Sequence, residues 1–243
     1  MSKKKKSSQV VANSDAPVEM SALKISALTK IYGDLVALSP MDLSIPAGQS
    51  VALVGSNGSG KTTFLRLAAG LLDRTAGDIE IMGHEIGTID ARAQVSYIPD
   101  DPVLYDDLTV REHLQYLGPL YGAEDWESRS EYLLEKLGIA HRADDLPSIF
   151  SRGLRQKTSL AVGFLRPFSL LLIDEPFVGL DEPGRRALLD LLAETSEKGA
   201  TVVIASHQLD LVKQTNRCIA LSEGSITYDG DPANADLAAL VGV

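Results

Sequence analysis

The chain has 243 residues, of which 44% are hydrophobic and 23% are charged. This composition is typical of a globular protein and excludes a chain that is disordered throughout. Aromatic residues make up only 5% and the formal net charge is −10, so we do not expect nucleic acid as a partner. The single cysteine, Cys218, excludes an intrachain disulfide and fits a reducing compartment.

The chain begins with a basic segment in which Lys3 to Lys6 are consecutive, and no apolar stretch follows it. A secretory signal requires such a stretch, and a transmembrane helix requires about 20 consecutive apolar residues. Neither is expected in this sequence. We predict a disordered basic tail over residues 1–20, whose lysines are either solvated or attracted to anionic lipid head groups.

Short apolar runs and glycine-containing turns follow the tail. Residues 41–45 alternate between apolar and polar, as a half-buried strand does, and a Pro-Ala-Gly turn ends them. Residues 51–54 are all apolar, which favours a buried parallel strand. We predict a helix over residues 64–72, interrupted near Gly70, and another short strand over residues 79–82.

The composition changes near residue 100. Residues 100–147 contain 12 Asp or Glu and 4 Lys or Arg, and their leucines recur at helical spacing. Strands are predicted again at residues 170–173 and 201–205, with a helix over residues 183–198 between them. This order indicates a right-handed parallel crossover, so the middle section is predicted to be a helical insertion in an α/β core.

A glycine-rich loop connects the strand at residues 51–54 to the next helix. Its sequence, Gly55-Ser-Asn-Gly-Ser-Gly-Lys-Thr62, matches the phosphate-binding pattern G-x-x-x-x-G-K-[ST] between a strand and a helix. The glycines let backbone N–H groups point at an anion, and the helix start adds partial positive charge. We expect Lys61 to reach the β- and γ-phosphates and the Thr62 hydroxyl to ligate Mg²⁺. The predicted nucleotide-binding residues of this loop are Gly55, Ser56, Asn57, Gly58, Ser59, Gly60, Lys61, Thr62 and Thr63.

Two carboxylates follow the buried strand at residues 170–173. Ligands gather at the carboxyl ends of parallel strands, and Asp174 is expected to hold Mg²⁺ there, directly or through water. Glu175 is expected to polarise the attacking water of phosphoryl transfer. Paired acids also end strands without any such role, but the phosphate loop upstream favours the catalytic interpretation.

The segment Phe150-Ser-Arg-Gly-Leu-Arg-Gln156 completes a set of motifs. With it, the sequence resembles the ATP-binding subunits of ABC transporters over roughly residues 22–232. The segment is similar to the family signature L-S-G-G-Q-x-Q, in the S-R-G-L-R-Q form common in ABC-2-like exporters. By this resemblance, Ser151 and Gly153 contact the γ-phosphate held by the opposite protomer. Independently, a hydroxyl and backbone N–H groups at a helix start bind anions well.

The resemblance extends to three further positions. Tyr32 matches the aromatic residue that stacks on adenine, with an ordinary edge-strand tyrosine as the alternative. Asp181 matches the loop that crosses the dimer interface. His207 matches the switch histidine that contacts the γ-phosphate. The remaining histidines lack such a context and are expected on the surface: His84, His113 and His141.

Three positions depart from the family pattern. Arg152 and Leu154 replace a glycine and a glutamine of the signature, and Arg152 is expected either to reach phosphate or to be solvated. Asp100 stands where the family has glutamine after an apolar strand. Its carboxylate can ligate Mg²⁺ through hard oxygen, or it can cap the helical insertion.

The resemblance implies an α/β fold. It consists of a P-loop NTPase core with a mainly parallel sheet, an N-terminal antiparallel β subdomain and an inserted α-helical subdomain. We predict that the ATP-binding core spans residues 21–99 and 165–243. The helical subdomain, which carries the signature motif, is predicted to span residues 100–164.

The implied function is ATP binding and hydrolysis that power transport, in the export direction, through a separate transmembrane permease subunit. ATP and Mg²⁺ are the expected cofactors, and the chain is expected at the cytoplasmic face of the cell membrane. One chain carries one set of motifs, so a second nucleotide-binding subunit is needed, either a copy of this chain or a related chain. The alternatives are a soluble ABC ATPase switch that is not coupled to transport and a regulatory subunit that does not hydrolyse ATP.

Overall fold

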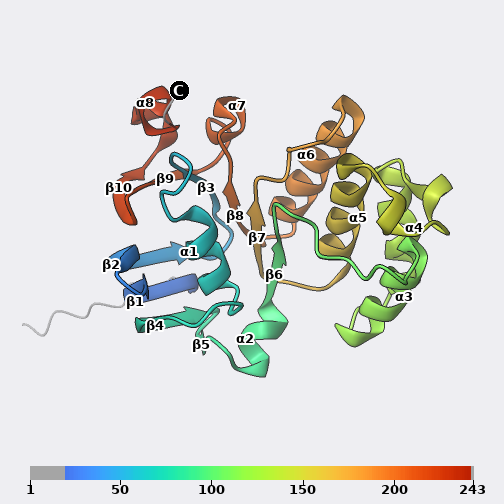
Figure 1. The fold of residues 1–243 in the computed structure, drawn as a ribbon, viewed down its shortest axis with the longest axis horizontal. Coiled ribbons are helices and arrows are strands. Elements are labelled where there is room, and N and C mark those ends of the chain that lie inside the picture. Colours follow the sequence, from blue (N-terminus) through green and yellow to red (C-terminus); the bar gives the residue numbers. More distant parts are fainter. Residues whose placement is uncertain (1–19, 242–243) are drawn as a thin grey trace, which may run out of the picture.

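The computed structural model describes residues 20–241. The predicted basic tail therefore lies outside the described residues, except for Met20. The described residues form two β-sheets with helices packed around them (Figure 1). The strands are β1 (Ser21–Tyr32), β2 (Leu35–Pro46), β3 (Ser50–Val54), β4 (Ala76–Ile81), β5 (His84–Glu85), β6 (Val95–Ile98), β7 (Leu170–Asp174), β8 (Thr201–Ala205), β9 (Arg217–Ser222) and β10 (Ser225–Gly230). The α-helices are α1 (Lys61–Ala68), α2 (Ile89–Gln94), α3 (Val110–Leu120), α4 (Trp126–Lys136), α5 (Arg152–Leu165), α6 (Glu182–Glu197), α7 (Leu209–Val212) and α8 (Leu237–Val241).

The smaller sheet is antiparallel, with the strand order β2-β1-β4-β5. Its strands alternate buried and exposed positions, because one face packs on the core and the other faces solvent. Leu23 pairs with both Ile45 and Ile81, and all three side chains are fully buried. This sheet confirms the predicted N-terminal antiparallel β subdomain.

The larger sheet has the order β10-β9-β3-β8-β7-β6, and every pair except β10–β9 is parallel. The continuous apolar runs of β3, β7 and β8 are buried because helices and the smaller sheet cover both faces. β7 and β8 are neighbours joined through α6, as the predicted parallel crossover requires. The pairing of Asp174 with Ala205 brings the ends of β7 and β8 to the same edge of the sheet.

Helices α3, α4 and α5 gather at the end of the molecule opposite the antiparallel sheet (Figure 1). A capping box starts α3, in which Thr109 and Glu112 satisfy each other's backbone N–H groups. Buried leucines from all three helices, including Leu114, Leu133 and Leu160, pack with the face of β7. The helical insertion is therefore continuous with the core of the larger sheet.

Two local predictions differ from the structure. The helix predicted over residues 64–72 begins earlier, at Lys61, and ends at Ala68. The predicted interruption near Gly70 is present, since Gly70 adopts a left-handed conformation with φ 70°. His113 is 1% exposed rather than on the surface. Its two ring nitrogens contact the Tyr105 N–H and the Thr109 carbonyl, both at 2.8 Å, so neutral imidazole satisfies the polar groups of the loop before α3.

Among residues 20–241, no helix combines the length and the hydrophobicity that crossing a bilayer would require.

Candidate nucleotide-binding site

The phosphate loop lies between β3 and α1, and its shape depends on glycine. Gly55 has φ 145° and Gly60 has φ 109°, which are unfavourable conformations for other residues. A Cβ atom at Gly55 would collide with the Leu221 carbonyl, and one at Gly60 would lie 2.7 Å from Leu38 Cδ2. The loop is thus packed directly against β9 and β2.

A turn that sequence reasoning missed supports this loop. The N–H of Gly224, between β9 and β10, donates to the Ser59 carbonyl at 3.0 Å, and the Gly224 carbonyl accepts from Ser39 N–H at 2.9 Å. Gly224 itself has φ 74°. A glutamate–glycine pair between two apolar strands indicates a hairpin turn, but nothing in the sequence places that turn against the phosphate loop.

The Lys61 ammonium lies over the same loop. Its side chain is largely buried, and Nζ donates to the Gly55 carbonyl at 2.7 Å and to the Ser56 carbonyl at 3.1 Å. Burial lowers the pKa of Lys61, while the nearby carboxylates Glu175 and Asp174 act in the opposite direction. The ammonium is therefore a poorly solvated cation held at the phosphate loop by two backbone carbonyls.

Asp174, the last residue of β7, is 1% exposed. Burial raises the pKa of its carboxyl, and the interacting Thr62 side chain opposes this shift. Within the described residues, Asp174 Oδ2 is buried without a hydrogen-bond partner. Carboxylate and hydroxyl oxygens are the donors that Mg²⁺ prefers, so Asp174 and Thr62 fit a magnesium ion.

Glu175 adopts a strained backbone conformation with φ 45°, although its N–H donates to the Ala205 carbonyl at 2.9 Å. Oε1 lies 3.0 Å from Nε2 of His207, the second residue after β8. Burial raises the pKa of Glu175 to about 7, against the opposing effect of the Lys61 ammonium. Burial and Lys61 both lower the pKa of His207. These shifts favour a proton-accepting Glu175 near neutral pH beside a neutral imidazole.

These residues meet in a cleft of about 620 Å³. Of the predicted site residues, the cleft is lined by Tyr32, Asn57, Gly58, Gly60, Lys61, Thr62, Thr63, Asp100, Asp174, Glu175 and His207. Tyr32 is half-exposed at the end of β1, with Lys30 Nζ 4.6 Å from its ring centroid. The ring is thus accessible at the rim of the cleft, as stacking on a base requires.

Asp100 caps no helix among the described residues. Instead, Asp100 Oδ1 lies 3.1 Å from Nη2 of Arg152, the first residue of α5. Both residues line the nucleotide cleft. Two of the positions that depart from the family pattern therefore pair with each other, which sequence reasoning missed.

Six predicted residues do not line this cleft: Gly55, Ser56 and Ser59 in the phosphate loop, and Ser151, Gly153 and Asp181. Ser151 is the N-cap of α5, and Asp181 is the N-cap of α6. A Cβ atom at Gly153 would lie 2.5 Å from the Gly179 carbonyl oxygen, and Lys157 Nζ is 2.8 Å from Asp181 Oδ1. The start of α5 is thus packed against the loop that follows Glu175.

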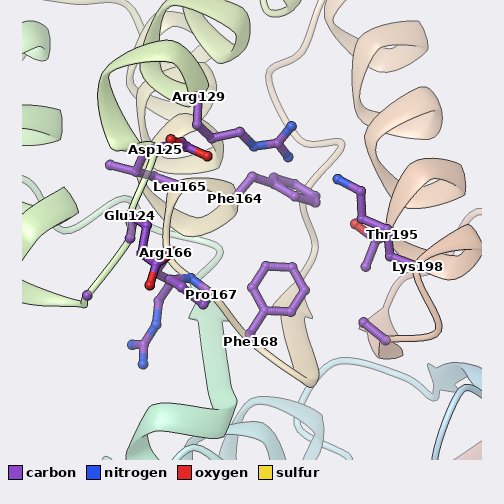
Figure 2. Close-up of a pocket in the computed structure, with 13 residues that line it drawn as sticks. Glu124, Asp125, Arg129, Phe164, Leu165, Arg166, Pro167, Phe168, Thr195 and Lys198 are labelled. Carbon is purple, nitrogen blue, oxygen red and sulfur yellow. The ribbon is translucent and has the colours of Figure 1, made fainter.

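A second cavity, of about 600 Å³, contains no predicted site residue. Figure 2 shows its aromatic side chains Phe164 and Phe168 facing Thr195 and Lys198, near the end of α6. Phe164 and Phe168 pack edge to face, with ring centroids 6.4 Å apart. The predicted nucleotide-binding and catalytic residues are concentrated in the other cleft.

Comparison with known proteins identifies the family. Residues 38–178 match a family model described as ABC transporter. The SkfA peptide export ATP-binding protein SkfE of Bacillus subtilis is 34% identical over 86% of this chain and 89% of its own length. The ABC-type transporter ATP-binding protein EcsA of the same organism is 37% identical over 87% of each chain. A solved structure of an ATP-binding subunit of an ABC transporter is 33% identical, with a TM-score of 0.82 over 86% of this chain and 90% of that chain. The chain therefore belongs to the ABC transporter family, as one of its ATP-binding subunits.

Proposed function

We propose that this chain binds ATP with Mg²⁺ in the cleft between the phosphate loop and the ends of β7 and β8, and that it hydrolyses the γ-phosphate bond to power export. The single observation that carries this proposal is the convergence of Lys61, Thr62, Asp174, Glu175 and His207 on one cleft. The loop and Lys61 would hold the phosphates, and Tyr32 would stack on the adenine. Phosphoryl transfer requires mainly such positioning and charge neutralisation.

Asp174 and Thr62 are the residues that would hold Mg²⁺. The buried Asp174 oxygen without a hydrogen-bond partner and the adjacent hydroxyl supply two hard ligands. When bound, the ion would neutralise charge on the phosphate oxygens. Asp100 lies in the same cleft and stays a predicted ligand, with one carboxylate oxygen already facing Arg152.

Glu175 would act as the general base. Its carboxylate would accept the proton of the attacking water, and its strained backbone and buried environment fix the position of that carboxylate. Nε2 of His207 lies 3.0 Å from Glu175 Oε1, which has no hydrogen-bond partner among the described residues. His207 would help to orient this carboxylate if a small movement formed the hydrogen bond. His207 would also contact the γ-phosphate from the end of β8.

Ser151, Gly153 and Asp181 would serve the nucleotide of a second subunit. They belong to this chain's motifs but do not line its own cleft, and Ser151 starts a helix of 14 residues, whose N-terminus favours anions. Two nucleotide-binding subunits facing each other would place each signature motif on the partner's ATP. We therefore propose a sandwich dimer with a copy of this chain or a related chain.

A separate permease would dock on a groove beside the helical insertion. This groove, of about 530 Å³, is lined by the exposed apolar side chains Leu71, Val103 and Tyr121. Its charged residues are Arg66, Asp100, Asp101, Arg166 and Asp174, and it shares Thr62, Asp100 and Asp174 with the nucleotide cleft. Such an exposed apolar patch is typical of a protein interface. Docking there would hold the chain at the cytoplasmic face of the membrane, and the peptide-export relative supports the export direction.

The test is phosphate release from ATP by the purified chain, with and without Mg²⁺, beside the Lys61→Ala variant. The proposal predicts Mg²⁺-dependent release that Lys61→Ala abolishes. Equal release by both proteins would contradict it. Co-purification of a membrane protein with the tagged chain from solubilised membranes tests the permease, and its absence would favour a soluble ATPase switch.

A further inference from the structure

The ion pair between Asp100 and Arg152 joins two separate parts of the fold. Asp100 follows β6 at the edge of the larger sheet, whereas Arg152 opens α5, the helix of the signature motif. The residues are 52 positions apart in the sequence. The pair therefore ties the start of the signature helix to the sheet edge that borders the nucleotide cleft.

Both partners face the place where the phosphates of a nucleotide would lie. They line the same cleft as Lys61, Thr62 and Asp174. The Arg152 guanidinium is thus a cation within its own chain's nucleotide cleft, although its neighbours Ser151 and Gly153 do not line that cleft. A polyphosphate bound there carries more negative charge than the single carboxylate that holds Arg152.

The ion pair between Asp100 and Arg152 is weak enough for another anion to replace Asp100. The Arg152 side chain is 58% exposed and that of Asp100 is 45% exposed, and exposed ion pairs contribute little to stability. By contrast, the neighbouring Lys157–Asp181 pair has a lysine side chain that is only 10% exposed. Arg155 also ties α5 to the segment after β6, but through the neutral Pro102 carbonyl at 3.2 Å. Of these three contacts, only the Asp100–Arg152 pair is an exposed charge pair in the cleft.

We propose that Asp100 and Arg152 form a latch that nucleotide releases. Without nucleotide, Asp100 holds Arg152 and fixes the start of α5 against the sheet edge. Phosphate groups bound in the same chain's cleft compete with Asp100 for the guanidinium, so Arg152 is a positioning residue that reports nucleotide occupancy to the signature helix. This inference rests on the proposed ATP binding.

The experiment is a double-mutant cycle for ATP affinity, measured calorimetrically in EDTA at concentrations where the chain is monomeric. The variants are Asp100→Asn, Arg152→Gln and the double variant. Asp100→Asn removes the competitor and should lower the Kd by about two- to fivefold, the scale of an exposed ion pair. Arg152→Gln should raise the Kd, and by a larger factor in the Asp100→Asn background, where the guanidinium is free to bind phosphate.

Arg111→Gln and Asp144→Asn provide the matched control. These residues form an exposed pair of 3.0 Å within the helical insertion, and neither lines the nucleotide cleft. Their cycle should leave the Kd unchanged. An equal effect of Arg152→Gln in both backgrounds, or no effect in either, would overturn the latch while leaving ATP binding intact. Failure of the wild-type chain to bind ATP would overturn the proposed function and the latch together.

Thermal denaturation of the same four proteins gives a second readout. The two substitutions should be coupled in Tm without nucleotide, because they remove the same contact, and the coupling should vanish at saturating ATP. A merely structural pair would show the same coupling in both conditions. Persistence of the coupling with ATP would therefore contradict the latch.

Discussion

Nε2 of His207 lies 3.0 Å from Oε1 of Glu175. The two residues come from segments that follow neighbouring parallel strands, and the pairing of Asp174 with Ala205 sets them side by side. Burial shifts the pKa values of both side chains: it raises the pKa of Glu175 and lowers that of His207. The sheet itself thus brings the two proposed catalytic residues together.

Replacing Glu175 with glutamine should preserve ATP binding and abolish turnover. Glutamine keeps the shape of the side chain but cannot accept the proton, and loss of a general base typically lowers the rate by about 10²- to 10⁴-fold. Steady-state phosphate release and calorimetric ATP affinity measure the two effects. Glu182→Gln, an exposed glutamate at the start of α6, is the matched control. Near-normal turnover by Glu175→Gln would assign the base to another residue.

Replacing Gly153 with alanine should lower ATP turnover while largely preserving ATP binding. The added Cβ would lie 2.5 Å from the Gly179 carbonyl oxygen, so the start of α5 must move away from that loop. ATP affinity of the monomer should change far less than turnover, since Gly153 does not line the cleft and only the neighbouring Arg152 does. Turnover should fall because the partner's signature motif is displaced. Unchanged turnover would show that the contact between Gly153 and Gly179 does not matter for the dimer.

The acidic segment before α3 should assist assembly with the permease. Asp106 and Asp107 are exposed near the apolar groove side chain Val103, and complementary charge speeds association and fixes orientation. Reversal of both aspartates to lysine should weaken co-purification of the membrane partner and leave ATP affinity unchanged. Glu112 is unsuitable for reversal, because its carboxylate belongs to the capping box of α3.

The control for this reversal is the double substitution Glu197→Lys and Asp210→Lys, at exposed positions outside the groove. The effect should also shrink in high salt, since the Debye length is only about 8 Å at physiological ionic strength. Equal recovery of the membrane partner with both reversals would show that the acidic segment is merely solvated.

Cys218 should be chemically silent in the folded chain. It is fully buried in β9, and burial raises the pKa of its thiol to about 11, so neither access nor thiolate is available at neutral pH. A thiol reagent at pH 7.5 should label the native protein far more slowly than the protein in denaturant, as followed by mass spectrometry. Labelling at the rate of a free thiol in both would contradict the structure of β9.

Local sequence patterns were sufficient to predict the two sheets and most of the residues that line the cleft. The apolar runs of β3, β7 and β8 and the glycine-rich loop determine their own conformations, and the carboxyl ends of parallel strands meet at one edge. This is why the sequence alone could predict that Lys61 and Asp174 would lie together.

Contacts between distant loops could not be predicted. His113 was expected on the surface. Instead, the loop that precedes α3 folds over it, and the Tyr105 N–H donates to Nε2 of His113. The Asp100–Arg152 pair and the support of Ser59 by Gly224 also depend on how separate segments pack. Helices and strands are predicted from repeating patterns along the sequence. A contact between two single side chains in distant segments leaves no such pattern.

In the proposed dimer, each ATP site combines the phosphate loop of one chain with the signature motif of another. Mixing the Lys61→Ala and Ser151→Arg variants tests it directly, because neither homodimer has a working site whereas each heterodimer has one. With random pairing of two copies, the equimolar mixture should recover about a quarter of wild-type ATP turnover. Turnover no greater than the sum of the two variants alone, under conditions where the wild-type chain is active, would contradict the shared site.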